Sequence, residues 1–405
     1  MGNLNGRPRA LVVGLGIAGI ATALRLRQIG WEPVVIERAP ARRSGGYFIM
    51  LFGAGIASAQ RLGVLDAIGD RSGPDVRLDS VNRAGRRRTG LNPATLGPNP
   101  PRTLLRGDAE RALFDALPDD VEIRYSTVPT RIAQDATAAE VDLHDTAADT
   151  TTTERFDLVV GADGMRSTVR RLTFGPEDFL HPLDYMIGVT LLDRPVTGYG
   201  TGEGMILAEP GRSAWMFPFK DHPPSLLFSY RTQNVDAEFS RAPIESIRAA
   251  FGPQPPGPIL EELFSRFESA DEFLFDSVNQ VRMPRWHDGR VVLVGDAAWC
   301  VTLYAGMGAS SGIAGGELLG TMLERHVGDV PAALREWEAR LRPFIAVEQE
   351  SAFTTRSLFT PHDRKEYLAR AVMTRLMGSP VLSRVLGSRA QPPGMEHKAI
   401  DIAAV

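Results

Sequence analysis

The stretch Ala10-Leu11-Val12-Val13-Gly14-Leu15-Gly16-Ile17-Ala18-Gly19, with Val34-Val35-Ile36-Glu37 after it, decides the fold of this chain. The apolar run 10–13 predicts a buried parallel strand. Apolar residues at helical spacing follow the glycines and predict a helix that begins among them. A second apolar strand, 34–36, ends in an acid. The sequence therefore predicts a strand–helix–strand unit of a parallel α/β sheet.

The glycines in this unit have the spacing G-x-G-x-x-G, which is typical of dinucleotide binding. We expect Gly14 to make the tight turn, Gly16 to let the backbone approach a pyrophosphate, and Gly19 to let helix and strand pack closely. The N–H groups at the helix N-terminus suit an anion, and Glu37 suits the ribose hydroxyls of an adenosine. An α/β turn without a ligand is the alternative, and the surrounding strand, helix and acid make it less favoured.

Composition limits the class of protein. The chain has 405 residues, 43% of them hydrophobic and 23% charged, which predicts a globular protein of about two domains. A net charge of −4 gives no indication of a nucleic-acid partner. Cys300 is the only cysteine, so we expect no disulfide within the chain and a reducing, cytoplasmic location. No stretch of the sequence is long and apolar enough to predict a transmembrane helix.

Two later stretches repeat the pattern of a buried strand followed by glycine and aspartate. A strand at 156–160 leads into Gly161-Ala162-Asp163-Gly164, which places a carboxylate among backbone amides. A strand at 291–294 leads into Gly295-Asp296, and the glycine-rich loop 306–309 then opens a helix near residue 310. Both aspartates suit hydroxyl groups of a ligand, and the loop amides suit negative charge. Structural turns without a ligand remain open for both stretches.

Other segments carry expectations about architecture. Residues 76–81 and 86–91 predict a hairpin, 57–68 a helix, and the threonine-rich stretch 146–153 a turn. Residues 181–275 predict alternating strands, in one of which Trp215, Phe217 and Phe219 share a face. Such a stripe is typical of the core face of an antiparallel sheet, or it lines an apolar pocket.

Taken together, the three glycine–acid motifs resemble those of the class A flavin monooxygenases, the p-hydroxybenzoate hydroxylase family, in order and spacing over about residues 8–350. The resemblance also matches Arg106 to an arginine that contacts the flavin. The cofactor-binding residues expected from the motifs and the resemblance are Gly14, Gly16, Ala18, Gly19, Glu37, Arg38, Arg106, Asp163, Gly295, Asp296, Gly306, Met307, Gly308 and Ala309.

The resemblance implies an α/β fold with three parts. A Rossmann-like FAD-binding domain of the glutathione-reductase type would comprise residues 1–72, 101–180 and 276–350. A smaller mixed or antiparallel β-sheet domain for the substrate would comprise 73–100 and 181–275, and C-terminal helices would follow over 351–405. Arg340 to Pro343 resembles the family's long helix with a proline in it.

The resemblance also implies the chemistry. NADPH or NADH would reduce FAD as a transient electron donor, O2 would react with the reduced cofactor, and one oxygen atom would go to a small molecule. We expect an aromatic or polyketide-type substrate, as in natural-product tailoring. No side chain is assigned as catalytic and no metal is expected. The residues expected to line the pocket are Trp215, Phe217, Trp299, Leu303 and Tyr304. The sequence indicates no oligomeric state.

Several residues depart from the family pattern. Trp299 stands where histidine is usual, Thr302 and Leu303 replace a common proline pair, and Met307 replaces a common glutamine or lysine. Two other functions therefore stay open: a pericyclase or cyclase that uses FAD structurally, and a flavoprotein dehydrogenase or reductase. A halogenase is disfavoured, because Ser213 replaces the first tryptophan of the halogenase W-x-W-x-I-P motif.

Overall fold

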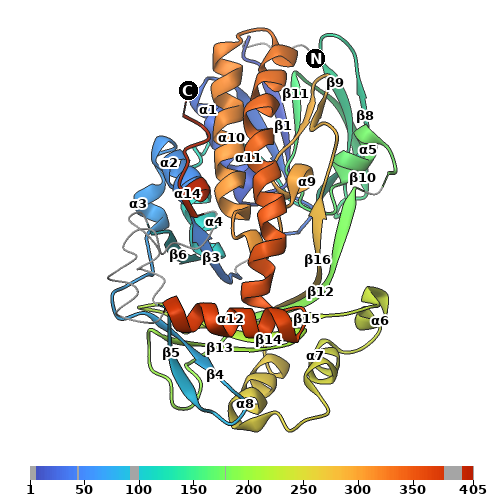
Figure 1. The fold of residues 1–405 in the computed structure, drawn as a ribbon. Coiled ribbons are helices and arrows are strands. Elements are labelled where there is room, and N and C mark those ends of the chain that lie inside the picture. Colours follow the sequence, from blue (N-terminus) through green and yellow to red (C-terminus); the bar gives the residue numbers. More distant parts are fainter. Residues whose placement is uncertain (1–5, 43–44, 92–99, 178, 378–394, 405) are drawn as a thin grey trace.

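The computed structural model describes residues 6–42, 45–91, 100–177, 179–377 and 395–404. Its elements form two bodies, which the long strands β12 (Leu180–Leu191) and β16 (Phe273–Val281) and the long helix α11 (Val330–Phe359) join (Figure 1). Helix α11 contains Pro343, as expected for the family's long helix, and it continues past residue 350, where we expected the C-terminal segment to begin.

The upper body is built on a six-stranded sheet. Its strands β1, β2, β7, β11 and β18 are parallel, and β17 pairs antiparallel with β18 at one edge. The order across the sheet is β17 (His287–Asp288), β18 (Val291–Leu293), β11 (Leu158–Gly161), β1 (Arg9–Val13), β2 (Glu32–Ile36) and β7 (Glu122–Arg124). The predicted strand–helix–strand unit is confirmed as β1, α1 (Ile17–Gln28) and β2.

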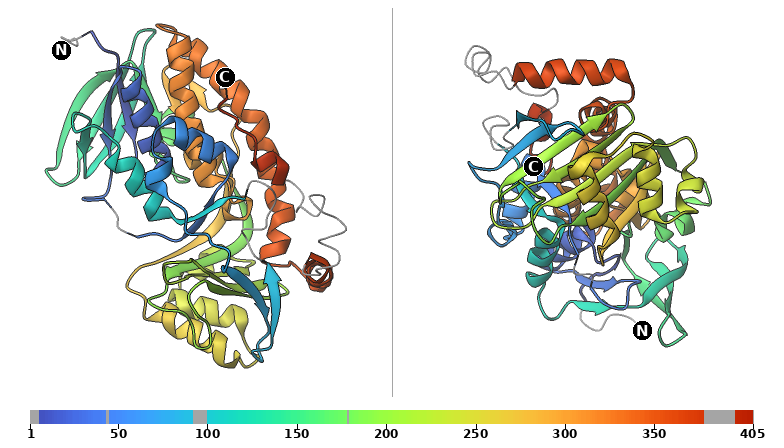
Figure 2. Two further views of the ribbon diagram at one scale, coloured as in Figure 1. Left: turned by 90° about the vertical axis from the view of Figure 1, so that its left-hand side faces the viewer. Right: turned by 90° about the horizontal axis from the view of Figure 1, so that it is seen from below.

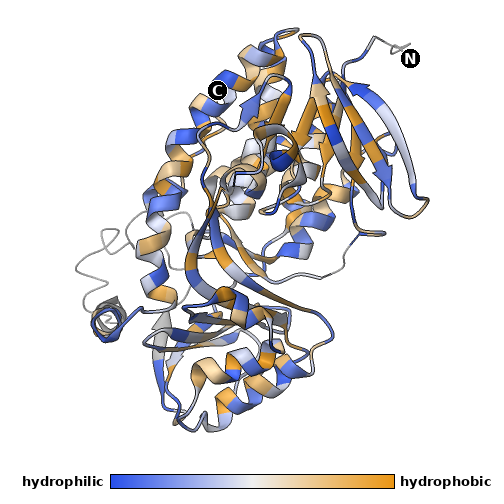
Figure 3. Cartoon of the chain, turned by 90° about the vertical axis from the view of Figure 1, so that its right-hand side faces the viewer, coloured by the Kyte–Doolittle hydropathy of each residue, from blue (hydrophilic) through white to orange (hydrophobic). Residues whose placement is uncertain are grey.

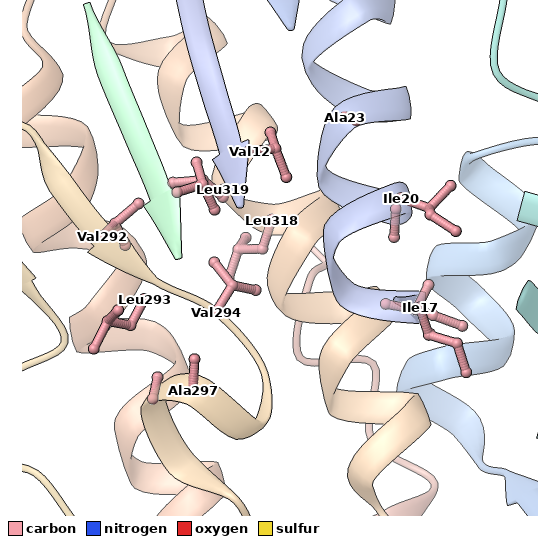
Figure 4. Close-up of a cluster of buried hydrophobic side chains, with 14 of the residues drawn as sticks. Val12, Ile17, Ile20, Ala23, Val292, Leu293, Val294, Ala297, Leu318 and Leu319 are labelled. Atoms are coloured by element: carbon pink, nitrogen blue, oxygen red, sulfur yellow. The ribbon is translucent and has the colours of Figure 1, made fainter. Parts of the chain in front are cut away.

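Helices cover one face of this sheet and a second sheet covers the other. Helices α1, α10 (Gly308–Arg325) and α11 lie on one side (Figure 2, left). The three-stranded antiparallel sheet of β8 (Thr127–Gln134), β9 (Ala139–Asp145) and β10 (Thr150–Phe156) lies on the other. Apolar residues concentrate in the sheet and on the helix faces turned toward it (Figure 3). Val12, Ile20, Val294 and Leu318 meet in the resulting core, and burying these side chains stabilises the layers (Figure 4).

The lower body is a seven-stranded sheet, antiparallel except where β13 pairs with β4. The order is β16, β12, β15 (Ser225–Arg231), β14 (Arg212–Phe217), β13 (Glu203–Glu209), β4 (Arg77–Val81) and β5 (Arg87–Leu91). Helices α7 (Pro243–Phe251) and α8 (Gly257–Glu268) cover one face through a cluster around Phe228, while α6 (Val235–Phe239) lies at the side. The opposite face carries Trp215 and Phe217 in a separate apolar cluster.

Short elements connect these layers. Strands β3 (Phe48–Leu51) and β6 (Arg102–Leu105) pair between the bodies, and α4 (Arg106–Asp115) follows β6 directly. The remaining helices are α2 (Gly53–Arg61), α3 (Leu65–Ile68), α5 (Thr168–Phe174), α9 (Asp296–Trp299), the short 3₁₀ helix η2 (Leu303–Ala305), α12 (Arg364–Met377) and α14 (Met395–Lys398). No helix in the described ranges combines the length and apolar character needed to cross a membrane.

Two local expectations are wrong. The stretch 146–153 is not wholly a turn, because residues 150–153 begin strand β10 and pair with 142–145 of β9. Threonine is β-branched and fits a pleated strand once a partner strand is available. The stretch 57–68 is not one helix, because the chain leaves α2 at Gly63, whose φ of 78° is outside the helical range, before α3 begins. The predicted hairpin is confirmed as β4 and β5.

Candidate functional site

The first and second glycine motifs pack against each other through backbone. Gly14 has a φ of +107°, and a Cβ atom there would lie 2.5 Å from the carbonyl oxygen of Ala162. A Cβ atom at Gly19 would overlap the carbonyl oxygen of Gly14. The fold itself therefore requires glycine at both positions, whether or not a ligand binds.

Gly16 and Gly308 are in a different situation. Among the described residues, a Cβ atom at Gly16 would have only the Nη2 atom of Arg106 within 4 Å, at 3.8 Å, and one at Gly308 only Oδ1 of Asp296, at 3.9 Å. Nothing in the packing of the described residues excludes a side chain at these two positions. The space beside each glycine is bounded by a charged side chain, which is the arrangement expected where a backbone must let a polar ligand come close.

Glu37 lies at the end of β2 and faces the first motif. Its Oε2 atom accepts a hydrogen bond from the backbone N–H of Leu15 at 3.0 Å, and Oε1 accepts one from the N–H of Ala39 at 2.9 Å. These bonds hold the carboxylate beside the glycine turn and leave lone pairs for further donors. The neighbouring Arg38 is solvent-exposed.

Arg106 begins α4 and is held from two sides. Its backbone N–H donates to the carbonyl of Tyr47 at 2.8 Å, and its Nη1 atom lies 2.6 Å from Oε2 of Glu110. The Glu110 side chain is only 8% exposed, and burial raises the pKa of its carboxyl group while Arg106 lowers it. Burial also raises the pKa of Tyr47. Neither Tyr47 nor Glu110 belongs to a recognisable sequence motif, so no pattern in the sequence indicated them.

Asp163 caps the helix that follows the second motif. Its carboxylate accepts hydrogen bonds from the Ser167 hydroxyl at 2.5 Å and from the backbone N–H groups of Thr168 at 2.6 Å and Val169 at 3.1 Å. Burial raises the pKa of this carboxyl group, against the effect of these donors. Asp163 therefore has a clear structural role at the start of α5.

The third motif meets the first through Ala18. A Cβ atom at Gly295, whose φ is +67°, would lie 2.9 Å from Cβ of Ala18, and one at Gly312 would lie 3.3 Å from the same atom. The next residue, Asp296, is solvent-exposed, yet burial by the surrounding protein raises the pKa of its carboxyl group. That combination describes a carboxylate enclosed by protein on most sides and open to solvent on one.

The glycine-rich loop leads directly into α10. Gly306 has a φ of +69°, and Met307 is the N-cap residue of this 18-residue helix. No side chain of the described residues caps the helix, so N–H groups of its first turn stay available, and the helix dipole adds positive potential there. Ala309 is partly exposed beside them. Phe52, which belongs to no sequence motif, would lie 3.4 Å from a Cβ atom at Gly306.

Many of the predicted cofactor residues thus lie close together. Gly14 touches the second motif, Ala18 touches the third, and the space beside Gly16 and Gly308 is bounded by Arg106 and Asp296. Arg38 is exposed to solvent. Among the residues that the structure describes, no group of histidine, cysteine, aspartate or glutamate side chains could hold a metal ion.

Aromatic rings from three elements form a row at the junction of the two bodies. Phe48 of β3 stacks on Phe217 at 4.2 Å between ring centroids, Phe217 on Trp215 at 5.3 Å, and Trp215 on Phe359 of α11 at 4.6 Å. The angles between neighbouring ring planes are 13°, 22° and 29°. The stripe predicted from Trp215 and Phe217 therefore continues into Phe48 and Phe359, which are far away along the chain and which no sequence motif indicated.

Tyr304 and Leu303 lie close to this row. Tyr304 belongs to the same apolar cluster, and its hydroxyl lies 2.8 Å from the Ser229 hydroxyl. Burial raises the pKa of Tyr304 above its ordinary value. Leu303 is partly buried against the cluster. A few polar groups thus sit among rings, which suits a flat, largely apolar ligand.

Trp299 lies apart from the other expected pocket residues. It is fully buried, its indole N–H donates to the Ser311 hydroxyl at 3.1 Å, and its ring packs against Trp286 at 4.8 Å and Trp337 at 5.8 Å. This tryptophan cluster is part of the core under α10 and α11. The position where the family usually has histidine is therefore used here for packing.

Comparison with known proteins shows which family and which solved structures this chain is similar to. A family model described as "FAD binding domain" matches residues 8–344. An uncharacterized protein of Mycobacterium tuberculosis is 31% identical over 356 residues, which cover 84% of this chain and 91% of that protein. The FAD-dependent monooxygenase asL4 of Sarocladium schorii is 26% identical over 343 residues, which cover 79% and 76%. The crystal structure of tetracycline destructase Tet(51) shares the fold with a TM-score of 0.76 at 24% identity, covering 99% of both chains.

Proposed function

This chain belongs to the class A flavoprotein monooxygenases and is an FAD-dependent monooxygenase, and we propose that NADPH or NADH reduces its FAD. We propose an aromatic or polyketide-type small molecule as the substrate that it oxidises. We also propose that the protein acts in natural-product tailoring and that it is located in the cytoplasm. One observation carries the assignment of the site. Gly16 and Gly308, which the packing does not require to be glycine, border space next to Arg106 and Asp296.

The residues at this site fit FAD. A pyrophosphate suits the open side of Gly16, where the N-terminus of α1 supplies N–H groups and Arg106 supplies positive charge. Glu37, already fixed by two backbone donors, has lone pairs left for ribose hydroxyls. Asp296, a carboxylate open on one side, suits the hydroxyls of the ribityl chain.

When bound, FAD supplies the electron transfer and the reaction with O2, and the protein supplies position and electrostatics. The uncapped N-terminus of α10 favours negative charge beside it by about 0.3–1 kcal/mol, and by up to ~2 kcal/mol where the site is partly buried. Ser310 in its first turn accepts a hydrogen bond from the N–H of Phe52 at 2.9 Å, which holds the helix against β3 and α2.

We assign the substrate to the junction between the bodies. The row from Phe48 through Phe217 and Trp215 to Phe359 offers stacking surface, and Tyr304 and Ser229 offer hydroxyl groups beside it. Apolar walls of this kind exclude water from a reactive site. The proposed division of the chain follows: an FAD-binding domain of residues 1–72, 101–180 and 276–350, a substrate domain of 73–100 and 181–275, and a C-terminal segment from 351.

The experiment is a single-turnover assay on the holoenzyme. We expect NADPH or NADH to bleach the flavin absorbance under anaerobic conditions, and a panel of flat polyphenolic and polyketide compounds to accelerate that bleaching. After O2 labelled with ¹⁸O is admitted, one labelled atom should appear in the product. Conversion of a compound by oxidised enzyme without nicotinamide, and without label, would contradict the proposal and favour a pericyclase.

A further inference from the structure

The C-terminal segment 395–404 packs onto the elements that form the proposed flavin site. Asp401 binds the guanidinium of Arg61 on α2 through both carboxylate oxygens, at 2.7 Å and 3.0 Å. Ala403 is 1% exposed. The backbone of Ala399 lies so close to Gly53 that a Cβ atom at Gly53 would be 2.7 Å from Cα of Ala399. Gly53 begins α2 directly after Phe52, so the segment is tightly fitted to this part of the site.

Lys398 is the residue of this segment that reaches the glycine-rich loop. Its Nζ atom donates to the carbonyl oxygen of Ala305, the last residue before Gly306, and lies 5.1 Å from the ring centroid of Phe52. Only 7% of Lys398 is exposed. The chain has three lysines against a large excess of arginine, and one of the three is buried at this loop.

A carboxylate provides the counter-charge for this buried amine. Glu348 of α11 is 1% exposed, and its negative charge raises the pKa of Lys398, against the effect of burial. Its Oε1 atom also lies 2.9 Å from Nδ1 of His397, whose ring stacks on Phe344 at 4.5 Å. Burial lowers the pKa of Lys398, while Glu348 favours the charged form. Burying a lysine is costly, which calls for a reason at this position.

We propose that Lys398 is a positioning residue for the flavin: by holding the Ala305 carbonyl and the Phe52 ring, it fixes the loop 306–308 and places a positive charge behind it. This inference rests on the proposed function, because it takes that loop to contact the flavin. Phe52 connects the same contact to α10 through its N–H bond to Ser310. The C-terminal segment therefore acts as a clamp on the N-terminus of α10.

The first test compares Lys398→Ala with Lys365→Ala, which removes an exposed lysine of α12. We expect Lys398→Ala to weaken FAD binding by about tenfold, the loss of one charged hydrogen bond, and to lower the flavin reduction potential. Lys365→Ala should change neither. Adding ethylammonium, which fits the space left by the lysine side chain, should restore both properties, whereas tetramethylammonium, which has no N–H, should not. Wild-type values for Lys398→Ala, or a loss that ethylammonium does not restore, would overturn the proposal.

A second measurement needs no variant. With ¹³C at the ε position of lysine, the protein gives three signals, one for each lysine. The Lys398 signal should shift between the apoprotein and the FAD complex, and again when the flavin is reduced, while the Lys365 signal stays in place. An unchanged Lys398 signal in all three states would overturn the proposal even if Lys398→Ala does not fold.

A third variant separates this inference from the assignment of the site. Gly308→Val should lose FAD if the loop contacts the flavin. If Gly308→Val binds FAD normally, the proposed site is wrong. If Gly308→Val loses FAD while Lys398→Ala keeps wild-type affinity and potential, the site stands and only the role of Lys398 is wrong.

Discussion

The rings of Phe48 and Phe217 stack face to face, with centroids 4.2 Å apart and 13° between their planes. Phe48 belongs to β3, beside the glycine-rich loop, and Phe217 belongs to β14 of the seven-stranded sheet. This contact joins the two bodies at the point where the proposed flavin and substrate sites meet. The aromatic row that we assign to the substrate thus also adds a side-chain contact between the two bodies.

Removing a ring from this row should affect stability according to its burial. Phe217 is 8% exposed, so Phe217→Ala should lower the free energy of unfolding by about 3–5 kcal/mol. Phe48 is less buried, and Phe48→Ala should cost less. Urea unfolding measures both, with Phe239→Ala, at a ring that is 46% exposed, as the control. Equal losses at Phe217 and Phe239 would show that the row contributes little to stability.

The two kinds of glycine should respond differently to valine. Gly16→Val and Gly308→Val add a side chain where the described residues leave room, so the apoprotein should keep its melting temperature while FAD binding is lost. Gly14→Val places a side chain against the Ala162 backbone at a positive φ and should prevent folding. Circular dichroism and flavin occupancy distinguish these outcomes. A yellow Gly16→Val protein would place the cofactor elsewhere.

Asp296→Asn should raise the stability of the apoprotein and weaken cofactor binding. Burial raises the pKa of Asp296, so the folded apoprotein binds the proton more tightly than the unfolded chain. The stability from this group is complete below the unfolded pKa of about 3.9 and is lost as pH rises through the higher folded value. Asparagine does not ionise and so avoids this loss of stability. The variant apoprotein should therefore become more stable than wild type as pH rises through the folded-state pKa of Asp296.

The same variant should bind FAD more weakly by about 1–3 kcal/mol, because ribityl hydroxyls lose a charged acceptor. Thermal melts of the apoprotein measure the effect on stability, and titration with FAD measures the effect on binding. The melts run from about pH 3 to about pH 8, which includes the ordinary pKa of an aspartate and the range above it. An apoprotein variant that is less stable than wild type at neutral pH, together with unchanged FAD affinity, would contradict the role assigned to Asp296.

Arg106→Ala should have two separable effects. It removes a positive group from the side of Gly16, so FAD binding should weaken by about 1–3 kcal/mol. It also leaves the buried carboxylate of Glu110 without its ion-pair partner at 2.6 Å. The double variant with Glu110→Gln should therefore recover stability without recovering FAD affinity. Recovery of both properties would mean that Arg106 acts only by holding α4.

Local sequence patterns predicted the helices and strands whose formation depends mainly on residues close together along the chain. The apolar run before Gly14 specifies β1, because a parallel strand covered on both faces is a continuous apolar run, and the helical spacing after it specifies α1. Alternation in the sequence also predicted β14 and β15, although the structure buries both faces of these strands. It did not specify β10, because a threonine-rich strand is polar and becomes a strand only when β9 pairs with it.

The arrangement of the site depends on contacts between residues that are far apart in the sequence, and local periodicity does not indicate such contacts. The motifs indicated Gly16 and Asp296, and the α/β fold of the family is confirmed. Only the tertiary structure brings Phe48 and Phe359 into the aromatic row, turns Trp299 into the core, and sets Lys398 against Ala305. Such pairings between distant segments are chosen by how whole layers pack and exclude water, a property of the complete core that no single stretch of sequence carries.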